Sequence, residues 1–450
     1  MLLTGSGRIP VPYTGPPRGV LATLSLTQLV GWGAVYYAFP VLSGVIVADT
    51  GWSPTGTAAA FTVALVASAV VGVPAGRWLD RRGPRGLMTA GSLLAVVALS
   101  LIGWSPTLGW FCAGWLLAGM AMGATLYPPA FAAVTRWHGP DRVRALMILT
   151  IAGGLASTVF APTTAVLADR FGWRVAFGLL AAAVAVVAVP AHLWGLRPAW
   201  PPPPVVTTAA HHPSAVTRSR AFLALTVALS LAALTQYAVV IGLVPLMTER
   251  GRGLGVAALL LGLSGAAQLL GRLGYPLLVR RVPLRARTVG VLVGITLTTA
   301  MLAVATSAVA VVLAVVAGGA LRGALTLVHA TAISDRWGTG HYGRLTGILS
   351  APIVLAAAVS PWLGALLAAR LGGHATAYLV LAGAAGLAAV AGLWSVPTSG
   401  DIPQSSTEGG SPAPGTSSVI SSRTRASRSA TIRRTVAGSW PPGSSTGQSR

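Results

Sequence analysis

Two arginines within long apolar stretches are the residues of this sequence best suited to binding chemistry. Arg272 lies in the apolar stretch 256–279 and Arg322 in the stretch 309–332, and neither stretch contains Asp or Glu. An ionisable residue inside a membrane helix is costly and by default indicates a functional site. A guanidinium stays charged and forms bidentate hydrogen bonds with a carboxylate, most strongly where water is scarce. The two arginines therefore predict a binding site for a small organic anion.

Arg272 has a second interpretation. Gln268 lies one helical turn before Arg272 and could orient it toward a substrate. Arg272 is also about seven residues, or roughly 11 Å, from the nearer end of its stretch. A side chain at that depth could instead snorkel to the membrane surface.

Arg322 lies about ten residues from either end of its stretch, so snorkelling is harder for it. It stands between Gly319 and Gly323, a spacing that also serves close packing of helices. His329 follows seven residues later on the same helical face. Because the ordinary pKa of histidine is near 6.5, His329 is the candidate carrier of a coupling proton.

Membrane-spanning helices are expected to carry these residues. Of the 450 residues, 54% are hydrophobic and 9% are charged, which is the composition of a polytopic membrane protein. A spanning helix needs about 20 mostly apolar residues. We therefore predict an all-α membrane protein with twelve transmembrane helices, at 19–43, 56–76, 87–104, 109–133, 145–167, 174–196, 221–247, 256–279, 288–305, 309–332, 345–368 and 375–396.

The net charge of +23 is explained by topology. All 31 basic residues are Arg; with the N-terminus inside, 24 fall in cytoplasmic segments and 5 in outer loops. Such a bias is the positive-inside pattern, with both termini cytoplasmic. The Arg-, Ala- and Gly-rich composition without Lys indicates a GC-rich bacterial genome, so we expect a bacterial inner-membrane protein. Its expected partners are the lipid bilayer, a small-molecule substrate and a coupling proton; we expect a monomer that does not bind nucleic acid.

The sequence contains two similar halves. A shift of 200 residues aligns identical residues, among them Tyr37 with Tyr237 and Trp137 with Trp337. A period of six helices implies parallel repeats, whose substrate sites lie near the membrane midplane between the halves. We therefore add Tyr36, Tyr37, Gln236 and Tyr237 to the expected site. The predicted segments are 1–18 (cytoplasmic N-terminus), 19–196 (first half), 197–220 (cytoplasmic linker), 221–396 (second half) and 397–450 (disordered cytoplasmic tail).

A short motif follows the second apolar stretch. Residues 76–85 read GRWLDRRGPR, which closely resembles the loop signature of the major facilitator superfamily. The resemblance implies a cytoplasmic gate in which the acidic residue pairs with neighbouring helices and the glycines permit close approach. Pro84 departs from the pattern, and Arg280 stands where Asp80 would map in the second half, so the two gates should differ. The matching residues are Gly76, Asp80, Arg81, Gly83 and Arg85.

The eighth stretch is similar to a narrower family. Residues 265–276, GAAQLLGRLGYP, resemble the eighth helix of monocarboxylate porters, where Arg272 matches the substrate-linked arginine and Gln268 occupies an acidic position. Residues 31–40, GWGAVYYAFP, also resemble that family, although Val41 stands where some animal members have Lys. The resemblance implies a secondary active transporter that moves a small organic anion by alternating access.

Other functions remain open. A drug or metabolite exporter of the same superfamily is the first alternative, although the fourth helix has no Arg before Arg136 and the fifth lacks a Gly-Pro-rich signature. A non-transporting membrane sensor is the alternative from another class. We do not expect an enzyme, a cofactor or a metal site, because the apolar stretches hold only Cys112, His192 and His329 as dispersed candidates.

Overall fold

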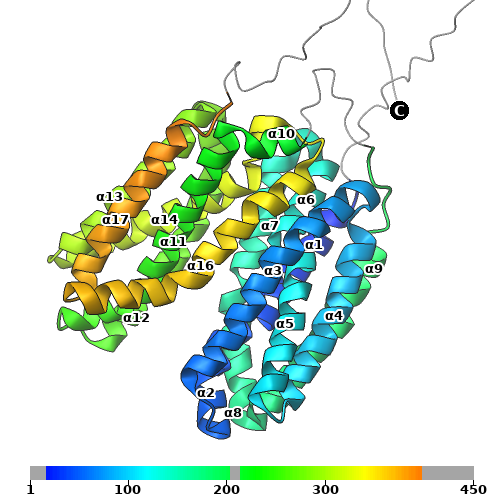
Figure 1. The fold of residues 1–450 in the computed structure, drawn as a ribbon, viewed down its shortest axis with the longest axis horizontal. Coiled ribbons are helices and arrows are strands. Elements are labelled where there is room, and N and C mark those ends of the chain that lie inside the picture. Colours follow the sequence, from blue (N-terminus) through cyan, green and yellow to red (C-terminus); the bar gives the residue numbers. More distant parts are fainter. Residues whose placement is uncertain (1–16, 203–212, 398–450) are drawn as a thin grey trace, which may run out of the picture. The chain divides into compact units, whose positions relative to one another are not determined.

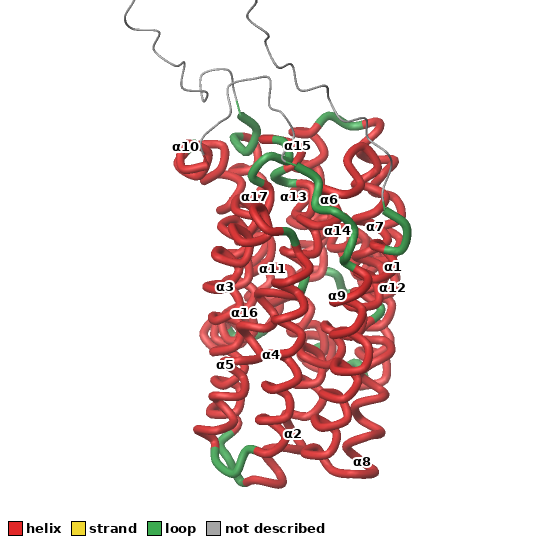
Figure 2. Tube along the Cα trace, turned by 90° about the vertical axis from the view of Figure 1, so that its right-hand side faces the viewer, coloured by secondary structure: helices red, strands yellow, loops and turns green. Residues whose placement is uncertain are grey.

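The computed structural model describes residues 17–202 and 213–397, and every regular element within them is a helix (Figures 1 and 2). The chain divides into a large unit, Met1–Pro403, and a small one, Gln404–Arg450. The small unit lies outside the described residues. So do residues 398–403 of the predicted tail and residues 1–16 of the predicted N-terminal segment.

The first half begins with a span interrupted by a π-helical segment. Each of the next two spans starts with a proline at its first turn, where no backbone N–H is needed. Gly172, with φ 79°, breaks α8 into the fifth and sixth spans. The elements are α1 (Val20–Gly31), η1 (Trp32–Tyr37), α2 (Ala38–Thr50), α3 (Pro54–Arg82), α4 (Pro84–Trp104), α5 (Leu108–Thr125), α6 (Tyr127–His138), η2 (Gly139–Asp141), α7 (Arg142–Gly154), α8 (Ala156–Ala183), η3 (Val184–Ala188) and α9 (Val189–Gly195).

The second half repeats the six spans after a short helix. Residues 213–218 of the predicted linker form that helix, α10. The elements are α10 (Pro213–Arg218), α11 (Arg220–Glu249), α12 (Leu254–Arg281), α13 (Leu284–Val304), α14 (Ala308–Thr331), α15 (Ser334–Trp337), α16 (Tyr342–Leu371) and α17 (His374–Leu393).

The helices confirm the predicted twelve-span architecture. Nine stretches of the described chain are long and apolar enough to cross a membrane. One of them, Leu108–Gly195, is 88 residues long and contains three passages, separated at η2 and at Gly172. The 28-residue helix α12 is the remaining span.

The two halves repeat the same contacts. Asp49, at the end of the first span, accepts hydrogen bonds from Trp173 Nε1 and Arg174 Nη1, both at 2.8 Å. Glu249, 200 residues later, accepts a bond from His374 N at 2.9 Å and pairs with His374 Nδ1 at 2.6 Å. In both halves an acidic residue thus ties the first span to the start of the last.

The halves meet at one end of the bundle. We call the end that carries the turn at Gly83 the inner end, because the arginine bias predicts that it faces the cytoplasm. One core cluster joins both halves near this end, with Leu79 and Trp137 from the first half and Phe222 and Tyr342 from the second. The other two clusters each lie within a single half. The structure is therefore closed at its inner end.

Candidate substrate site and inner gate

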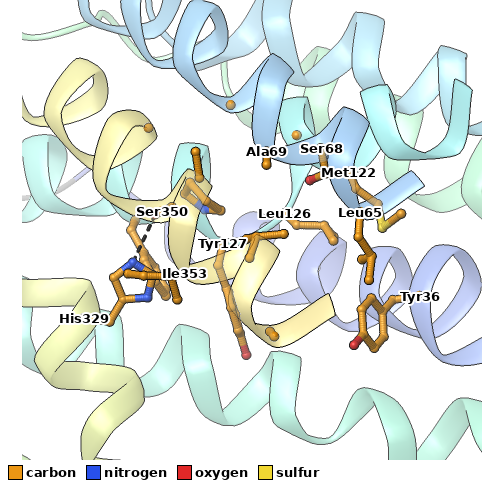
Figure 3. Close-up of a pocket in the computed structure, with 18 of the residues that line it drawn as sticks. Tyr36, Leu65, Ser68, Ala69, Met122, Leu126, Tyr127, His329, Ser350 and Ile353 are labelled. Carbon is orange, nitrogen blue, oxygen red and sulfur yellow. Dashed lines mark hydrogen bonds between the residues drawn. The ribbon is translucent and has the colours of Figure 1, made fainter. Parts of the chain in front are cut away.

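A cavity of about 150 Å³ lies between the two halves, and we call it the central cavity. Its walls come from the first, second and fourth spans of the first half and from the seventh, tenth and eleventh spans of the second half (Figure 3). Apolar and aromatic side chains dominate the lining. Its residues include Trp32, Tyr36, Leu65, Met122, Leu126, Tyr127, Phe131, Tyr237, Thr326, His329, Ser350 and Ile353.

The π-helical segment η1 supplies the aromatic wall. The Trp32 ring lies 5.1 Å from the Tyr36 ring and 4.8 Å from the Tyr127 ring, measured between centroids. Tyr37 packs against Tyr36 at 5.2 Å. The π-helical register, which is frequent at functional sites, was not foreseen from the sequence. Gln28 fixes this wall, because its amide donates to the Thr125 carbonyl at 2.7 Å and accepts from Trp32 Nε1 at 3.2 Å.

His329 brings a titratable group to the central cavity. Its Nε2 lies 3.0 Å from the Ser350 hydroxyl (Figure 3). Its ring packs edge-on against Phe131. Which atom of the pair donates depends on the tautomer. The imidazole is therefore placed where it could exchange a proton with the cavity through Ser350.

Arg272 crosses from the second half to the first. Its side chain is only 6% exposed, and its Nη1 donates to the Thr150 carbonyl of α7 at 2.7 Å. The Tyr127 hydroxyl donates to the same carbonyl at 3.3 Å, so Arg272 lies directly behind the wall of the central cavity. Gly154 makes room for the guanidinium, because a Cβ there would collide with Nη1. Arg272 thus does not snorkel to the inner surface.

Gln268 has a different position from the one expected. Its side chain makes no hydrogen bond to Arg272, whose partner is Thr150. Gly323 packs against the backbone carbonyl of Gln268, and a Cβ on Gly323 would collide with that carbonyl. Gln268 is half-buried, and the close approach of α12 and α14 fixes its backbone.

Arg322 and Gln236 line a second, smaller cavity within the second half. The Nη2 of Arg322 donates to the Ser264 hydroxyl at 2.6 Å. Tyr37 and Tyr237 lie near enough to Arg272 and Arg322 for their hydroxyls to lie in the field of both positive charges. The structure thus gathers Tyr36, Tyr237 and His329 around the central cavity, with Tyr37 and Arg272 behind its walls, and places Arg322 and Gln236 in the neighbouring cavity.

Neither guanidinium has an ionic partner among the described residues. The acidic residues that form ion pairs or join neighbouring helices lie at the ends of spans or between them, as Asp49, Asp80, Glu249 and Asp335 do. The Nε atoms of Arg272 and Arg322 are buried and have no hydrogen-bond partner in the described structure. The interior therefore holds two positive charges that can accept an anion.

The loop motif joins the two halves at the inner end, where the sequence predicts a gate. Asp80 Oδ1 accepts the backbone N–H of Gly343 at 2.9 Å, and Oδ2 accepts that of Arg344 at 2.8 Å. These amides belong to the first turn of α16, where a carboxylate is favoured by the free N–H groups and the helix dipole. Gly76 faces Gly343 so closely that a Cβ on Gly76 would collide with the Gly343 carbonyl.

The other motif residues act within the first half. Gly83 has φ 78°, and its N–H closes the end of α3 on the Leu79 carbonyl at 2.9 Å. Arg85 Nε donates to the Leu193 carbonyl at 2.9 Å, whereas Arg81 is exposed. These three residues shape the turn and do not reach the second half.

A second gate contact was missed from the sequence. Asp335 pairs with Arg142 of the first half at 3.1 Å and with Arg287 of α13, while Arg142 Nε also donates to Ser334 at 3.2 Å. Burial lowers the pKa of the adjacent Arg336 to about 10, which leaves it charged at neutral pH. The signal that could have revealed this contact was Arg280: with a cation at the position of the gate carboxylate, the second half needs a carboxylate elsewhere.

Comparisons with known proteins identify the family and the fold. The sequence profile of the Major Facilitator Superfamily matches residues 24–318. Among solved structures, the chain resembles the Major Facilitator Superfamily transporter FucP in the outward conformation, with a TM-score of 0.68, 13% identity, and coverage of 85% of this chain and 100% of FucP. The proton:xylose symporter XylE gives a TM-score of 0.62 at 15% identity over 83% of this chain and 94% of XylE.

A further structure is similar to the same degree. The human organic anion transporter MFSD10 (TETRAN) gives a TM-score of 0.63 at 15% identity, covering 85% of this chain and 100% of that protein. A search of curated protein sequences found no match. At these identities the structural likenesses show the fold alone.

Proposed function

Because this chain belongs to the major facilitator superfamily, we propose that it is a secondary active transporter that moves a small organic anion of the monocarboxylate type by alternating access. The two halves would rock about the central cavity and expose it to one side of the membrane at a time.

The observation that carries this proposal is the buried guanidinium of Arg272. Its partner in the inner-closed state is the neutral carbonyl of Thr150, which leaves the positive charge uncompensated. A carboxylate entering past Tyr127 would supply both the charge and a bidentate acceptor. Since Arg272 and Thr150 belong to opposite halves, exchanging that bond for one to the substrate would loosen a contact that holds the halves together. Substrate binding and rocking would then be coupled.

The lining of the central cavity supports a substrate with an apolar body. Leu65, Met122 and Ile353 offer no hydrogen bonds from their side chains, so this part of the wall would leave the hydroxyls of a sugar without partners and suits an apolar group. We therefore favour a monocarboxylate over a sugar such as the xylose of the symporter XylE. The similarity to MFSD10, an organic anion transporter, agrees with this choice.

Coupling and orientation complete the proposal. His329, paired with Ser350, would carry the coupling proton because, among the described residues of the cavity wall, imidazole is the group whose ordinary pKa is nearest neutral. The protein would lie in a bacterial inner membrane as a monomer with both termini cytoplasmic. Asp80 and Asp335 would then hold the cytoplasmic side closed. The motif residues Gly76, Arg81, Gly83 and Arg85 would shape and anchor that gate.

A drug or metabolite exporter is the second candidate. The mainly aromatic and apolar cavity wall favours it, because such walls also suit lipophilic compounds. Thermal unfolding of the purified protein with small carboxylates, cationic drugs or sugars separates the candidates. We expect stabilisation by carboxylates; stabilisation by cationic drugs alone would favour the exporter.

Arginine variants test the role of Arg272 directly. Arg272→Lys keeps the charge but loses the bidentate fork, so we expect binding of a stabilising carboxylate to weaken about tenfold or more, and Arg272→Ala to abolish it. The matched control is Arg281→Lys, an exposed position on the same helix, which should leave binding unchanged. Proteoliposome uptake gives the transport readout. Activity like that of the unaltered protein in Arg272→Lys would refute the anion-binding role.

A further inference from the structure

The smaller cavity lies entirely within the second half, between α11, α12, α13 and α14, and we call it the second-half cavity. Its volume is about 20 Å³. A water-sized sphere itself occupies about 10–15 Å³, so the cavity has room for a water molecule or a monatomic ion but not for an organic substrate. Its polar lining residues are Gln236, Ser264, Thr298, Thr299 and Arg322.

These polar side chains carry unused hydrogen-bond donors. Gln236 is 4% exposed and Thr299 is 2% exposed, and neither side chain has a hydrogen-bond partner among the described residues. Ser264 accepts a bond from Arg322 at 2.6 Å, which leaves its own proton free to donate. The Nε of Arg322 is also buried without a partner in the described structure. Buried polar groups are almost always satisfied, so this cluster indicates a ligand that accepts hydrogen bonds.

Thr298 provides an internal comparison. Its hydroxyl donates to the carbonyls of Gly294 at 2.9 Å and Ile295 at 3.2 Å, as a threonine within a helix commonly does. Thr298 therefore lines the same cavity, but its hydroxyl proton is already used in these hydrogen bonds. The free donors are confined to the other four side chains.

The charge of the cluster decides the class of ligand. No carboxylate pairs with Arg322 among the described residues, and a positive charge inside a membrane span, here with its Nε buried, is strongly unfavourable without a counter-charge. A water molecule would accept hydrogen bonds but would leave the charge uncompensated. We propose that the second-half cavity binds a monatomic anion, chloride or bromide, held by Arg322, Gln236, Ser264 and Thr299.

This site goes beyond the proposed organic-anion transport. It lies in one half and not between the halves, so the bound halide stays in place when they rock. Gln236 is followed in sequence by Tyr237, which lines the central cavity and interacts electrostatically with Arg322. A halide that neutralises Arg322 leaves Arg272 as the cation available to the organic substrate.

Thermal unfolding of the full-length purified chain tests the proposal. Sodium chloride and sodium bromide are compared with sodium methanesulfonate, an anion that is too large for the cavity and carries no carboxylate, at equal ionic strength. We expect a saturable rise in Tm of roughly 2–5 °C in chloride and bromide up to about 100 mM, and none in methanesulfonate. Equal Tm values of the unaltered protein in chloride and methanesulfonate would overturn the proposal.

Matched variants place the halide within the cavity. Thr299→Val removes a free donor with little change of shape, so the halide-dependent rise should shrink. Thr298→Val removes a hydroxyl that is already bonded and should retain the rise. Arg322→Gln should abolish it; a rise that survives in both Arg322→Gln and Thr299→Val would locate the halide elsewhere and refute the site. If Arg322→Gln does not fold, equilibrium binding of radioactive chloride decides, with one ion per chain expected and none refuting the site.

Arg272→Ala separates this site from the substrate site. That variant should lose carboxylate binding and keep the halide-dependent rise. If both effects disappear together, the halide occupies the substrate site and a separate halide site is refuted. If carboxylates fail to bind the unaltered protein while the halide effect persists, the proposed substrate class fails and the halide site stands.

Discussion

Replacing Asp80 by Asn is the sharpest test of the inner gate. Each carboxylate oxygen of Asp80 accepts one backbone N–H, from Gly343 at 2.9 Å and from Arg344 at 2.8 Å. Asparagine has a single acceptor oxygen, so in either orientation its NH₂ group faces one of these N–H donors. The substitution thus removes one hydrogen bond and the negative charge while keeping the size of the side chain.

The expected cost follows from these two losses. A hydrogen bond to a charged group contributes about 1.5–3 kcal/mol net, and a charge at a helix N-terminus contributes about 0.3–1 kcal/mol. Together the inner-closed state should lose about 2–4 kcal/mol relative to the inner-open state. The ratio of the two states would fall by about 30-fold to several hundredfold. Transport should slow, because the inner-closed state becomes rare, while expression stays near normal.

Distances between spin labels measure this shift. The single cysteine, Cys112, is first replaced by Ala. Labels at the exposed positions 82 and 281 then report the separation of the halves at the inner end. Asp141→Asn is the control, because it makes the same charge change at the inner end without a hydrogen bond to the other half in the described structure. An unchanged distance distribution and normal transport in Asp80→Asn would remove the gate role from this loop.

Two further predictions concern the coupling proton and the second gate contact. In His329→Gln we expect any proton dependence of uptake to disappear, measured in proteoliposomes with an imposed pH gradient; strong pH-driven uptake that persists would mean that the proton travels with the substrate or through a loop acid. In Asp335→Asn the same spin labels should show a smaller opening than in Asp80→Asn, because Arg142 keeps its bond to Ser334 and is partly exposed. An opening as large as that of Asp80→Asn would show that the second contact is the dominant one.

The fold could be predicted because the features that determine it can be read directly from the sequence. The thickness of the bilayer sets the length of the apolar stretches, and the 200-residue repeat is visible as identical residues. The motif also predicted that Asp80 pairs with a neighbouring helix, and Asp80 accepts two backbone N–H groups of α16. The predicted span 256–279 corresponds to Leu254–Arg281 in the structure, a difference of two residues at each end.

The partners of the two buried arginines were not predictable in this way. Arg272 binds the carbonyl of Thr150, and a backbone carbonyl carries no sequence signal. Arg322 faces the second-half cavity because the packing of α14 on α12 sets its rotation. Gly319 fits against the backbone of Ser264, so a one-residue change of contact there would turn Arg322 to another side. Sequence periodicity gives the face of a helix but not the neighbour that this face meets.

The two inner gate contacts show how a repeat can diverge and still close. At the outer end both halves keep the same contact, in which an acidic residue, Asp49 or Glu249, joins the first span to the start of the last span. At the inner end Arg280 stands in place of the carboxylate, and a guanidinium cannot accept N–H groups from α7. The charges of the second contact are therefore distributed differently: the cation, Arg142, lies at the start of α7, and the carboxylate, Asp335, belongs to the second half. The first contact uses backbone amides of α16 and requires glycine at position 343, because a Cβ there would collide with the Gly76 carbonyl and with Asp80 Oδ1. The second depends on three side chains, so substitutions can tune its strength while the first keeps the register of the halves.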